Sequence, residues 1–387
     1  MMPLSRHPNF RAVLLQRRKP NIVMSVYRLS AMRKSVLVLC LTVSLMSAAQ
    51  VQVSEKPWMP RLTGTIRTKF ELQTEEMESR FEVRNARVAF VGDVVKGVSY
   101  KAEIDFSDEG VIKMRDAYGE VKPFDFRPER QYVGRLALRL GQFRVPFSID
   151  AHRSPHEQFF SNRSFLAKQV GDVRDVGAMV AYGLPLGKQN GGHRLNVQVG
   201  AFNGSGLTDQ KNYWTKTLNF SAKVDYHLPL GLTLEGSVQK THPTGGVIYL
   251  YDGGVSFRRN AFMLEAEYMR KHYTNATFKD VNAVNCMALY DIPLAGARKA
   301  NRLFHHMSLR ARFDAMGDHS SGAFNEEGVL AVDDVARKRI TGGVTFCFLK
   351  KVAAELRLNY EKYFYDEGAT PKVSERDKAV VELMVHF

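Results

Sequence analysis

Cationic side chains at every second position are the feature of this sequence that could do chemistry. In residues 135–140, Arg135 and Arg139 lie on one side of a two-residue alternation and three leucines lie on the other. Such a period places the leucines on one face of a β-strand and the arginines on the opposite face. Guanidinium groups match phosphate oxygens in pairs, so a row of them could bind or conduct anions. The same parity predicts further charges on this face, namely Arg67, Lys69, Arg87, Lys101, Lys223, Arg310, Arg312, Arg357, Glu103, Asp105, Asp225, Asp314 and Glu355. The plain alternative for each is a strand-to-strand ion pair.

The sequence lacks the residue patterns that nucleophilic catalysis, metal binding or a phosphate-binding loop would require. Nucleophilic catalysis would need Ser, His and an orienting residue on one face. The pair His305-His306 is expected to point to opposite faces, and Ser308 follows only on the His306 side, without a third member. The histidines are scattered, no cysteine pair has metal-ligand spacing, and the loop 203–206 lacks the Gly-Lys-Ser/Thr of a phosphate cradle. We therefore predict no enzyme, catalytic residue, cofactor or metal.

The N-terminus predicts export. Arg33 and Lys34 precede an apolar run at 35–46 and small residues before Gln50, so residues 32–49 have the form of a cleaved signal peptide. Residues 1–31 are a basic extension, and Met32 is the expected initiator. The predicted organisation is an extension plus signal peptide at 1–49 and one domain at 50–387, because no linker composition or repeat divides the remainder.

Cleavage after Ala49 removes eight Lys/Arg and no acids, which leaves 338 residues with a net charge of +7. This charge suggests an attraction for anions but is far from a nucleic-acid-binding composition, so we expect no nucleic-acid partner. Cys286 and Cys347 are the cysteines that remain, and we place them in strands two apart, too far for a disulfide. Beyond the signal there is no apolar run of eighteen residues, and therefore no expected membrane helix.

Period-two segments recur along the whole exported part. We predict sixteen strands, each near the length that a membrane-spanning strand requires. They cover about 63–70, 85–90, 98–106, 111–122, 135–142, 173–183, 195–201, 218–228, 232–240, 251–257, 262–270, 282–291, 303–314, 337–349, 352–363 and 378–387. The second, fourth and twelfth of these have mixed parity.

The connections carry an independent pattern. After even-numbered strands they are mostly tight, at 93–96, 228–231, 258–260 and 349–351. After odd-numbered strands they are mostly long and polar, at 143–172, 203–214, 315–336 and 364–377. Short turns at one end and long loops at the other are typical of an outer-membrane barrel. A secreted soluble sandwich is the rival fold, but it gives no reason for this sorting.

The cost of placing a cation in lipid indicates which face of each strand points into the barrel. A cation at mid-bilayer on the lipid face of a barrel costs roughly 2–4 kcal/mol, a large part of the stability of a folded domain. The arginines should therefore face a wet lumen and the leucines should face lipid. The predicted fold is all-β: a single transmembrane antiparallel barrel of about sixteen strands. The long polar loop at 143–172 could fold into the pore of such a barrel.

Several stretches resemble the phosphate-selective porin O/P family, in its Bacteroidetes branch. The blocks that carry the resemblance are 85–88 (NARV), 115–118 (RDAY), 140–147 (LGQFRVPF), 163–164 (RS), 174–177 (RDVG), 201–204 (AFNG) and 312–314 (RFD). In addition, the terminal strand ends at Phe387 and resembles the signal that barrel-assembly machinery reads.

The resemblance implies a homotrimeric porin in the Gram-negative outer membrane, with a third external loop that narrows the channel. It implies passive diffusion of small anions such as phosphate along inward-facing arginines. The predicted anion pathway consists of Arg87, Asp116, Arg139 and Arg144 by motif, Arg135 by parity, and Arg163, Lys168 and Arg174 on or beside the loop. The expected partners are small anions, outer-membrane lipid and barrel-assembly machinery. The alternative is a related barrel for polyphosphate, oligosaccharides or peptides, or a mainly structural surface protein.

Overall fold

The structure is a computed structural model, and from residue 59 onward the described residues belong to one compact unit. They are 59–108, 111–122, 135–170, 174–184, 195–207, 210–243, 246–274, 278–294, 303–320, 324–332, 335–348, 353–366, 369 and 371–387. The predicted extension and signal peptide at 1–49 lie outside these residues.

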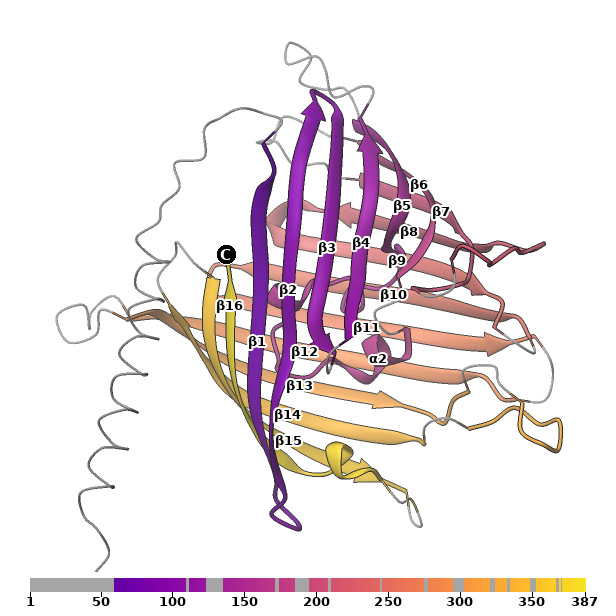
Figure 1. The fold of residues 1–387 in the computed structure, drawn as a ribbon. Helices are drawn as coiled ribbons and strands as arrows, with labels where there is room; N and C mark the ends of the chain where they lie inside the picture. Colours follow the sequence, from indigo (N-terminus) through magenta and orange to yellow (C-terminus); the bar gives the residue numbers. More distant parts are fainter. Residues whose placement is uncertain are drawn as a thin grey trace, which may run out of the picture. The chain divides into compact units, whose positions relative to one another are not determined.

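In the described part of the chain, sixteen strands form one sheet that closes on itself (Figure 1). They are β1 (Arg61–Gln73), β2 (Ser79–Val95), β3 (Val98–Asp108), β4 (Val111–Val121), β5 (Arg135–Arg144), β6 (Arg174–Leu184), β7 (Leu195–Phe202), β8 (Asn219–His227), β9 (Leu232–Thr241), β10 (Ile248–Arg259), β11 (Phe262–Tyr273), β12 (Val281–Pro293), β13 (Phe304–Met316), β14 (Arg337–Phe348), β15 (Ala353–Tyr365) and β16 (Lys378–His386). Each strand pairs antiparallel with its sequence neighbours, and β1 pairs with β16. The predicted sixteen-stranded barrel is confirmed, and the soluble-sandwich alternative is wrong.

The two faces of the wall differ as the parity predicts. On β5, Leu138 and Leu140 are exposed outward, whereas Arg139 turns inward and binds Glu120 of β4 at 2.6 Å. The predicted inner-face charges Arg67, Lys69, Arg87, Lys223, Arg310, Arg312, Arg357, Glu103, Asp105 and Asp314 are all buried. Burial of so many charges requires partners, because an uncompensated buried charge costs several kcal/mol.

The sorting of the connections is confirmed in part. Tight turns follow β2 at 96–97, β8 at 228–231 and β10 at 260–261. Long connections follow β5, β7, β13 and β15. The pattern has exceptions: 122–134 and 185–194 are long although they follow even-numbered strands, and the connection between β3 and β4 is only 109–110.

The last residue closes the barrel. The backbone N–H of Phe387 donates to the Gly64 carbonyl at 3.0 Å, and Gly64 N–H donates back at 2.8 Å. The Phe387 ring lies against Gly64 so closely that a Cβ at position 64 would meet it at 2.4 Å. The Phe387 ring therefore packs where β16 pairs with β1, and the absence of a side chain at Gly64 leaves space for it.

Bulges explain two of the strands with mixed parity. The register between β1 and β2 shifts at Arg67/Thr68, which leaves Arg84 as an extra residue on β2. The register between β3 and β4 shifts at Glu103/Ile104, which does the same to Arg115 on β4. A bulge puts two adjacent residues opposite one, so the alternation changes phase there.

A third bulge corrects the expectation for the histidine pair. The register between β13 and β14 shifts between Phe304 and His306, and the two Nδ1 atoms of His305 and His306 lie 3.1 Å apart. The imidazoles are therefore neighbours and do not point to opposite faces.

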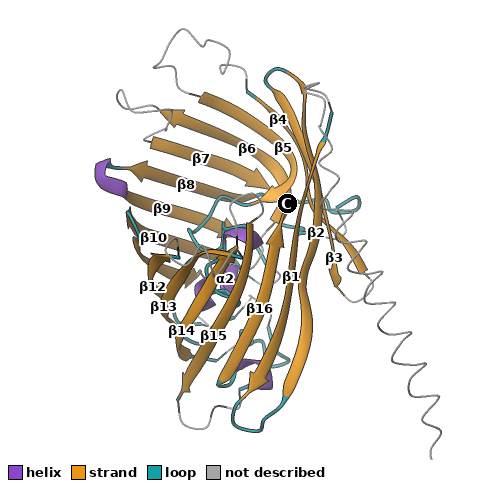
Figure 2. Cartoon of the chain, turned by 90° about the vertical axis from the view of Figure 1, so that its left-hand side faces the viewer, coloured by secondary structure: helices purple, strands orange, loops and turns teal. Residues whose placement is uncertain are grey.

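The segment between β5 and β6 contacts the inner face of the wall. Its described part, 145–170, begins two residues later than predicted because β5 continues to Arg144. It contains the 3₁₀ turn η1 (Pro155–Glu157) and the helix α2 (Phe165–Val170), which lies within the ring of strands in Figure 2. The side chains Phe147, Phe165 and Leu166 pack on inward-facing apolar residues Ile248, Leu250, Met269, Val281, Ala283 and Met316. Among the described residues, no helix has the length and apolar composition needed to cross a bilayer.

Candidate functional site

A basic cavity lies where β2 and the β3–β4 hairpin diverge. β2 pairs with β3 only from Arg87 onward, so the first half of β2 has an open edge toward the hairpin. The cavity has a volume of about 730 Å³. Its charged lining consists of Arg67, Arg80, Arg84, Arg87, Arg115, Arg163 and one acid, Glu82. Six guanidinium groups around one carboxylate favour an anion as the occupant.

Arg84 and Arg115 lie farther from their nearest acid than the other arginines that the wall contributes to the cavity, whereas Arg80 binds Glu71 at 2.5 Å. The side chain of Arg84 is 43% exposed and lies 3.5 Å from Glu82, and Arg115 lies 3.3 Å from Asp105. Arg87, in contrast, is buried and binds Asp105 at 2.8 Å. Because each guanidinium has five N–H donors, Arg84 and Arg115 have the geometry to contact a further anion.

The loop segment 145–170 is tied to the wall by arginines. Arg67 of β1 binds Glu382 at 2.6 Å and also donates to the Ser161 carbonyl at 2.7 Å. Arg312 of β13 donates to the Asn162 carbonyl at 2.9 Å, and Arg339 of β14 donates to the Arg163 carbonyl at 2.7 Å. β1 lies far from β13 and β14 in sequence, so the segment contacts distant parts of the chain and is fixed among inward-facing charges.

A family model matches part of the sequence. The model of phosphate-selective porins O and P matches residues 64–247, which include most of β1, all of β2 to β9 and the predicted loop. Over these residues the chain is similar to the phosphate-selective porin O and P family. The resemblance found in the sequence is thereby confirmed. Together with the closed barrel, the family match supports an outer-membrane porin and points to a channel rather than an enzyme.

Solved porins share the architecture. At 12% identity, the OmpF of Salmonella typhi in complex with daunomycin has a TM-score of 0.57 and covers 87% of this porin and 99% of its own chain. OprB of Pseudomonas putida, also at 12% identity, has a TM-score of 0.58 with coverages of 85% and 94%. An anion-selective porin from Comamonas acidovorans has 13% identity, a TM-score of 0.53 and coverages of 84% and 98%. At these identities the similarity shows the fold alone. None of the curated protein sequences compared with the chain matches it.

Four predicted pathway residues form a second group in this porin, around the start of the loop. Asp116 accepts hydrogen bonds from Arg174 and Lys101 at 2.7 Å each. Arg139 lies 4.2 Å over the ring of Tyr118, and Arg144 donates to the His152 carbonyl at 2.6 Å.

The pKa values of His152 and Asp150 reflect the charge that surrounds this turn of the loop. Burial and then the nearby cations, Lys223 and Arg144 first, lower the pKa of His152 well below its usual value. Burial alone would raise the pKa of Asp150, but Arg153 and the Ser164 hydroxyl hold it below its usual value. The surroundings of the loop turn thus favour negative groups and disfavour an additional positive charge.

The other predicted residues are dispersed. Arg87 and Arg163 line the basic cavity. Arg163 also donates to the Ala151 carbonyl at 3.4 Å. Arg135 lies exposed at the first position of β5, and Lys168 of α2 binds Glu375 of the turn η4 (Val373–Glu375) at 2.6 Å. The structure therefore brings the eight predicted residues together only in two groups, and leaves Arg135 and Lys168 outside both.

Four arginines of the cavity are missing from the predicted pathway. Arg67 is predicted only as an inner-face charge, and Arg115 only as part of a motif. Arg80 and Arg84 lie on a part of β2 outside the predicted strand 85–90. A signal was present, because Arg80, Glu82 and Arg84 alternate with Phe81 and Val83. The bulge at Arg84 ends that alternation and conceals that the strand continues.

Proposed function

We propose that this chain is an outer-membrane porin that conducts small anions, phosphate among them, by passive diffusion. The basic cavity carries the proposal, since six arginines and one acid surround about 730 Å³. The name of the matched family gives the same substrate class. Fixed cations in a water-filled barrel concentrate anions and exclude cations, and several weak sites allow an ion to leave again.

The segment 145–170 is the proposed constriction. It occupies positions next to inward-facing arginines of β1, β13 and β14, so it reduces the cross-section while those arginines hold it. Arg144 and Arg163 both donate to backbone carbonyls of its turn at 151–153. We infer that Arg87, Asp116, Arg139, Arg174 and these two arginines set the charge along the path of the anion.

The proposed assembly is a homotrimer embedded in outer-membrane lipid. OmpT of Vibrio cholerae, a barrel with a TM-score of 0.50 to this chain, is described as a trimer form. The exposed leucines of β5 and the apolar residues at alternate positions of β16 are suited to lipid or to a neighbouring barrel. The strand that ends at Phe387 is the proposed contact with barrel-assembly machinery. Chemical cross-linking in outer membranes should give a band at three times the monomer mass.

Reversal potentials in planar bilayers test the conduction. Residues 50–387 are reconstituted, and a KCl gradient is applied across the membrane. We expect a reversal potential of the sign that chloride permeability gives. A cation-selective pore, or a protein that does not conduct, would contradict the proposal.

Two substitutions test the cavity. Arg84→Gln and Arg115→Gln should each lower the anion-to-cation permeability ratio by about two- to fivefold, since a unit charge a few ångströms from an ion in water contributes up to about 1 kcal/mol. Lys279→Gln is the control, because Lys279 is 71% exposed on the β11–β12 connection, where it pairs with Asp318. An equal effect of all three variants would show that only net charge matters.

Solute competition tests the specificity. Phosphate added to a chloride-conducting pore should reduce the chloride current if both ions use the arginine sites. Swelling of liposomes with neutral sugars should be slow by comparison. Fast swelling with oligosaccharides and no competition by phosphate would favour the related barrel of different specificity.

A further inference from the structure

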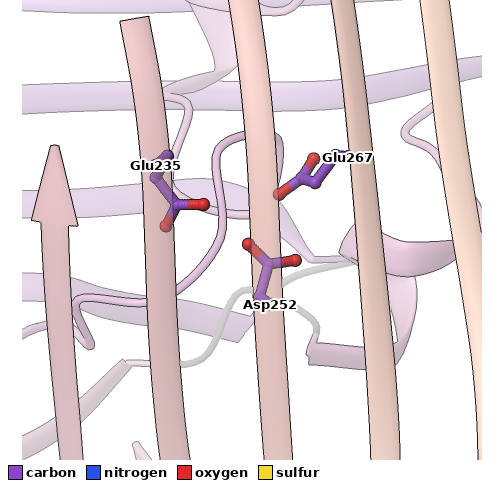
Figure 3. Close-up of side chains that lie close together, drawn as sticks. All are labelled: Glu235, Asp252 and Glu267. Carbon is purple, nitrogen blue, oxygen red and sulfur yellow. The ribbon is translucent and has the colours of Figure 1, made fainter. Parts of the chain in front are cut away.

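Three inward-facing carboxylates from neighbouring strands lie close together on the inner face of the barrel. Glu235 of β9, Asp252 of β10 and Glu267 of β11 each offer an oxygen atom, and these atoms lie within 4.8 Å of one another. We name them the acid cluster. Figure 3 shows the three side chains directed toward one another from neighbouring strands. The proposed anion path does not use them.

A glycine in β10 makes the convergence possible. Glu235 and Glu267 are both register partners of Gly254, which contributes no side chain between them, and Asp252 lies two residues along the same strand. The space above Gly254 is taken by Ile149 of the loop, since a Cβ at position 254 would meet Ile149 Cδ1 at 2.5 Å. The loop residue therefore covers the cluster, and Glu235 and Glu267 are only 7% and 2% exposed.

Buried oxygens of the cluster have no hydrogen-bond donor. Among the described residues, no donor reaches either carboxylate oxygen of Glu235 or the Oδ2 atom of Asp252. One cation of the described residues lies within 4 Å of the cluster: Lys223, whose Nζ is 3.7 Å from Glu235 and donates to the Ser148 carbonyl at 2.7 Å. Three carboxylates beside one shared lysine leave negative charge uncompensated in a covered site, which costs several kcal/mol unless something neutralises it.

Glu267 links the cluster to the loop. Its Oε1 accepts hydrogen bonds from the Ser148 hydroxyl at 2.5 Å and from Ile149 N–H at 2.6 Å. Within the described part of the chain, its Oε2 accepts a single, longer bond, from Asp150 N–H at 3.2 Å, so it keeps capacity for a further partner. Anything that binds the cluster therefore binds next to the first turn of the segment 145–170.

We propose that the acid cluster is a binding site for one divalent cation, of the hard class to which Ca²⁺ and Mg²⁺ belong. The donors are carboxylate oxygens, which these ions prefer, whereas Zn²⁺ sites usually include His or Cys. Opposite ligands of a Ca²⁺ ion at 2.3–2.6 Å are about 4.6–5.2 Å apart, so oxygens within 4.8 Å of each other suit one shared ion. The cation neutralises the cluster and fixes the Ser148–Asp150 turn to β11.

Calcium binding by the purified barrel tests the site, and it does not depend on whether the barrel conducts anions. The protein in detergent is stripped with EDTA, dialysed and titrated with CaCl₂ by calorimetry. We expect one Ca²⁺ per chain with a dissociation constant below about 1 mM, and a rise of about 3 °C or more in the midpoint of thermal unfolding at 5 mM CaCl₂.

Single substitutions locate the binding. Asp252→Asn should weaken Ca²⁺ binding at least about tenfold and abolish the calcium-dependent rise in the midpoint, even if its own midpoint without calcium is higher because repulsion is relieved. Glu235→Gln, which keeps the volume, is the second variant in case the first fails to fold. Asp225→Asn is the matched control, because Asp225 lies on the adjacent β8, 3.6 Å from the same Lys223, but outside the cluster.

Two results would overturn the proposal. If the wild-type barrel binds no Ca²⁺ at millimolar concentration and chelators leave its midpoint unchanged, protons shared between the carboxyls neutralise the cluster. If calcium raises the midpoints of wild type and Asp252→Asn equally, the ion binds elsewhere, for example to residual lipid.

Discussion

Arg339 of β14 shows how a buried charge on the inner face is made tolerable. Its guanidinium binds Asp314 at 2.8 Å and Glu361 at 3.2 Å, and it donates to the Arg163 carbonyl of the loop at 2.7 Å. The side chain is fully buried, and the ring of Phe165 lies 4.5 Å from it. One residue thus compensates two acids and holds the loop, so it contributes to both the wall and the constriction.

Removal of this arginine should destabilise the barrel. Arg339→Gln leaves Asp314 and Glu361 buried without their main cation, which should lower the free energy of unfolding by about 3 kcal/mol. Urea unfolding in detergent measures the loss. Lys279→Gln, which breaks an exposed pair, should change it by less than about 1 kcal/mol. A similar small effect for Arg339→Gln would mean that water solvates this part of the lumen.

His156 of η1 gives the loop a dependence on pH. Its ring stacks on His386 of β16 with ring centroids 3.7 Å apart. Burial and then His386 lower the pKa of His156 to about 4, from an ordinary value of 6.5. Protonation therefore favours the unfolded chain: the stability is fully present above pH 6.5 and is lost as the pH falls through 4.

Unfolding at two pH values tests this stacking. Between pH 7.5 and pH 4.5 the wild-type barrel should lose more stability than His156→Gln, because the variant has no imidazole to protonate. All other titrating groups are shared, so the difference between the two proteins isolates His156. Equal losses would show that protonated His156 is solvated in the folded barrel.

At the scale of elements, the strands were predictable because the bilayer imposes a strict alternation. Wherever one face meets lipid and the other meets charge, as in Arg135–Leu140, the two-residue period was visible in the sequence. The two-residue period was lost where other side chains of the protein, in place of lipid or water, contact one face of a strand. β12 turns Val281, Ala283, Met287 and Leu289 inward against the loop side chains, so its inner face is mostly apolar and its parity looks mixed in the sequence. Such contacts depend on where a long loop lies, which no local pattern shows.

The candidate site was predictable only in part for the same reason. Arg87 follows the regular alternation and was found, whereas Arg84 and Arg115 lie at bulges that shift the phase. Ion-pair partners were also hidden, because Arg174 and Asp116 are brought together by the return of the loop. Parity predicts which face a residue has, but closure of the barrel decides what it touches.

The backbone conformation at Gly141 explains why the block 140–147 contains a glycine at this position. Its φ of +132° is a conformation that side chains rarely adopt, and a Cβ would meet the Ala117 carbonyl oxygen at 2.3 Å. Gly141→Ala should therefore destabilise the β4–β5 pairing by about 1–3 kcal/mol, measured by urea unfolding. Gly119→Ala in β4 is the matched control, since nothing lies within 4 Å of its Cβ position. Equal stability of the two variants would mean that β5 can relax at Gly141.

At the scale of the whole molecule, two opposite charge arrangements share one lumen. Arginines outnumber acids around the basic cavity between β1 and β4, whereas acids outnumber cations at the acid cluster between β9 and β11. The loop segment contacts both sides, through Gln158 and Arg163 at the cavity and through Ser148 at the cluster. Whether the proposed channel prefers anions or cations therefore depends on which of these two regions the hydrated ions pass.

Ionic strength distinguishes a long-range field from direct contact sites. The Debye length falls from about 10 Å at 0.1 M salt to about 3 Å at 1 M, so charges that act across open water lose their effect while contacting guanidinium groups keep theirs. The exposed Arg84 belongs to the first kind, whereas Arg67, Arg80 and Arg87 are already closely paired with acids. We therefore expect the anion-to-cation permeability ratio to fall several-fold between 0.1 M and 1 M KCl, measured as reversal potentials at a constant concentration ratio. Arg84→Gln should flatten this dependence, whereas Lys279→Gln should leave it unchanged. A ratio that stays constant up to 1 M would place selectivity at a narrow site in direct contact with the ion, within the segment 145–170.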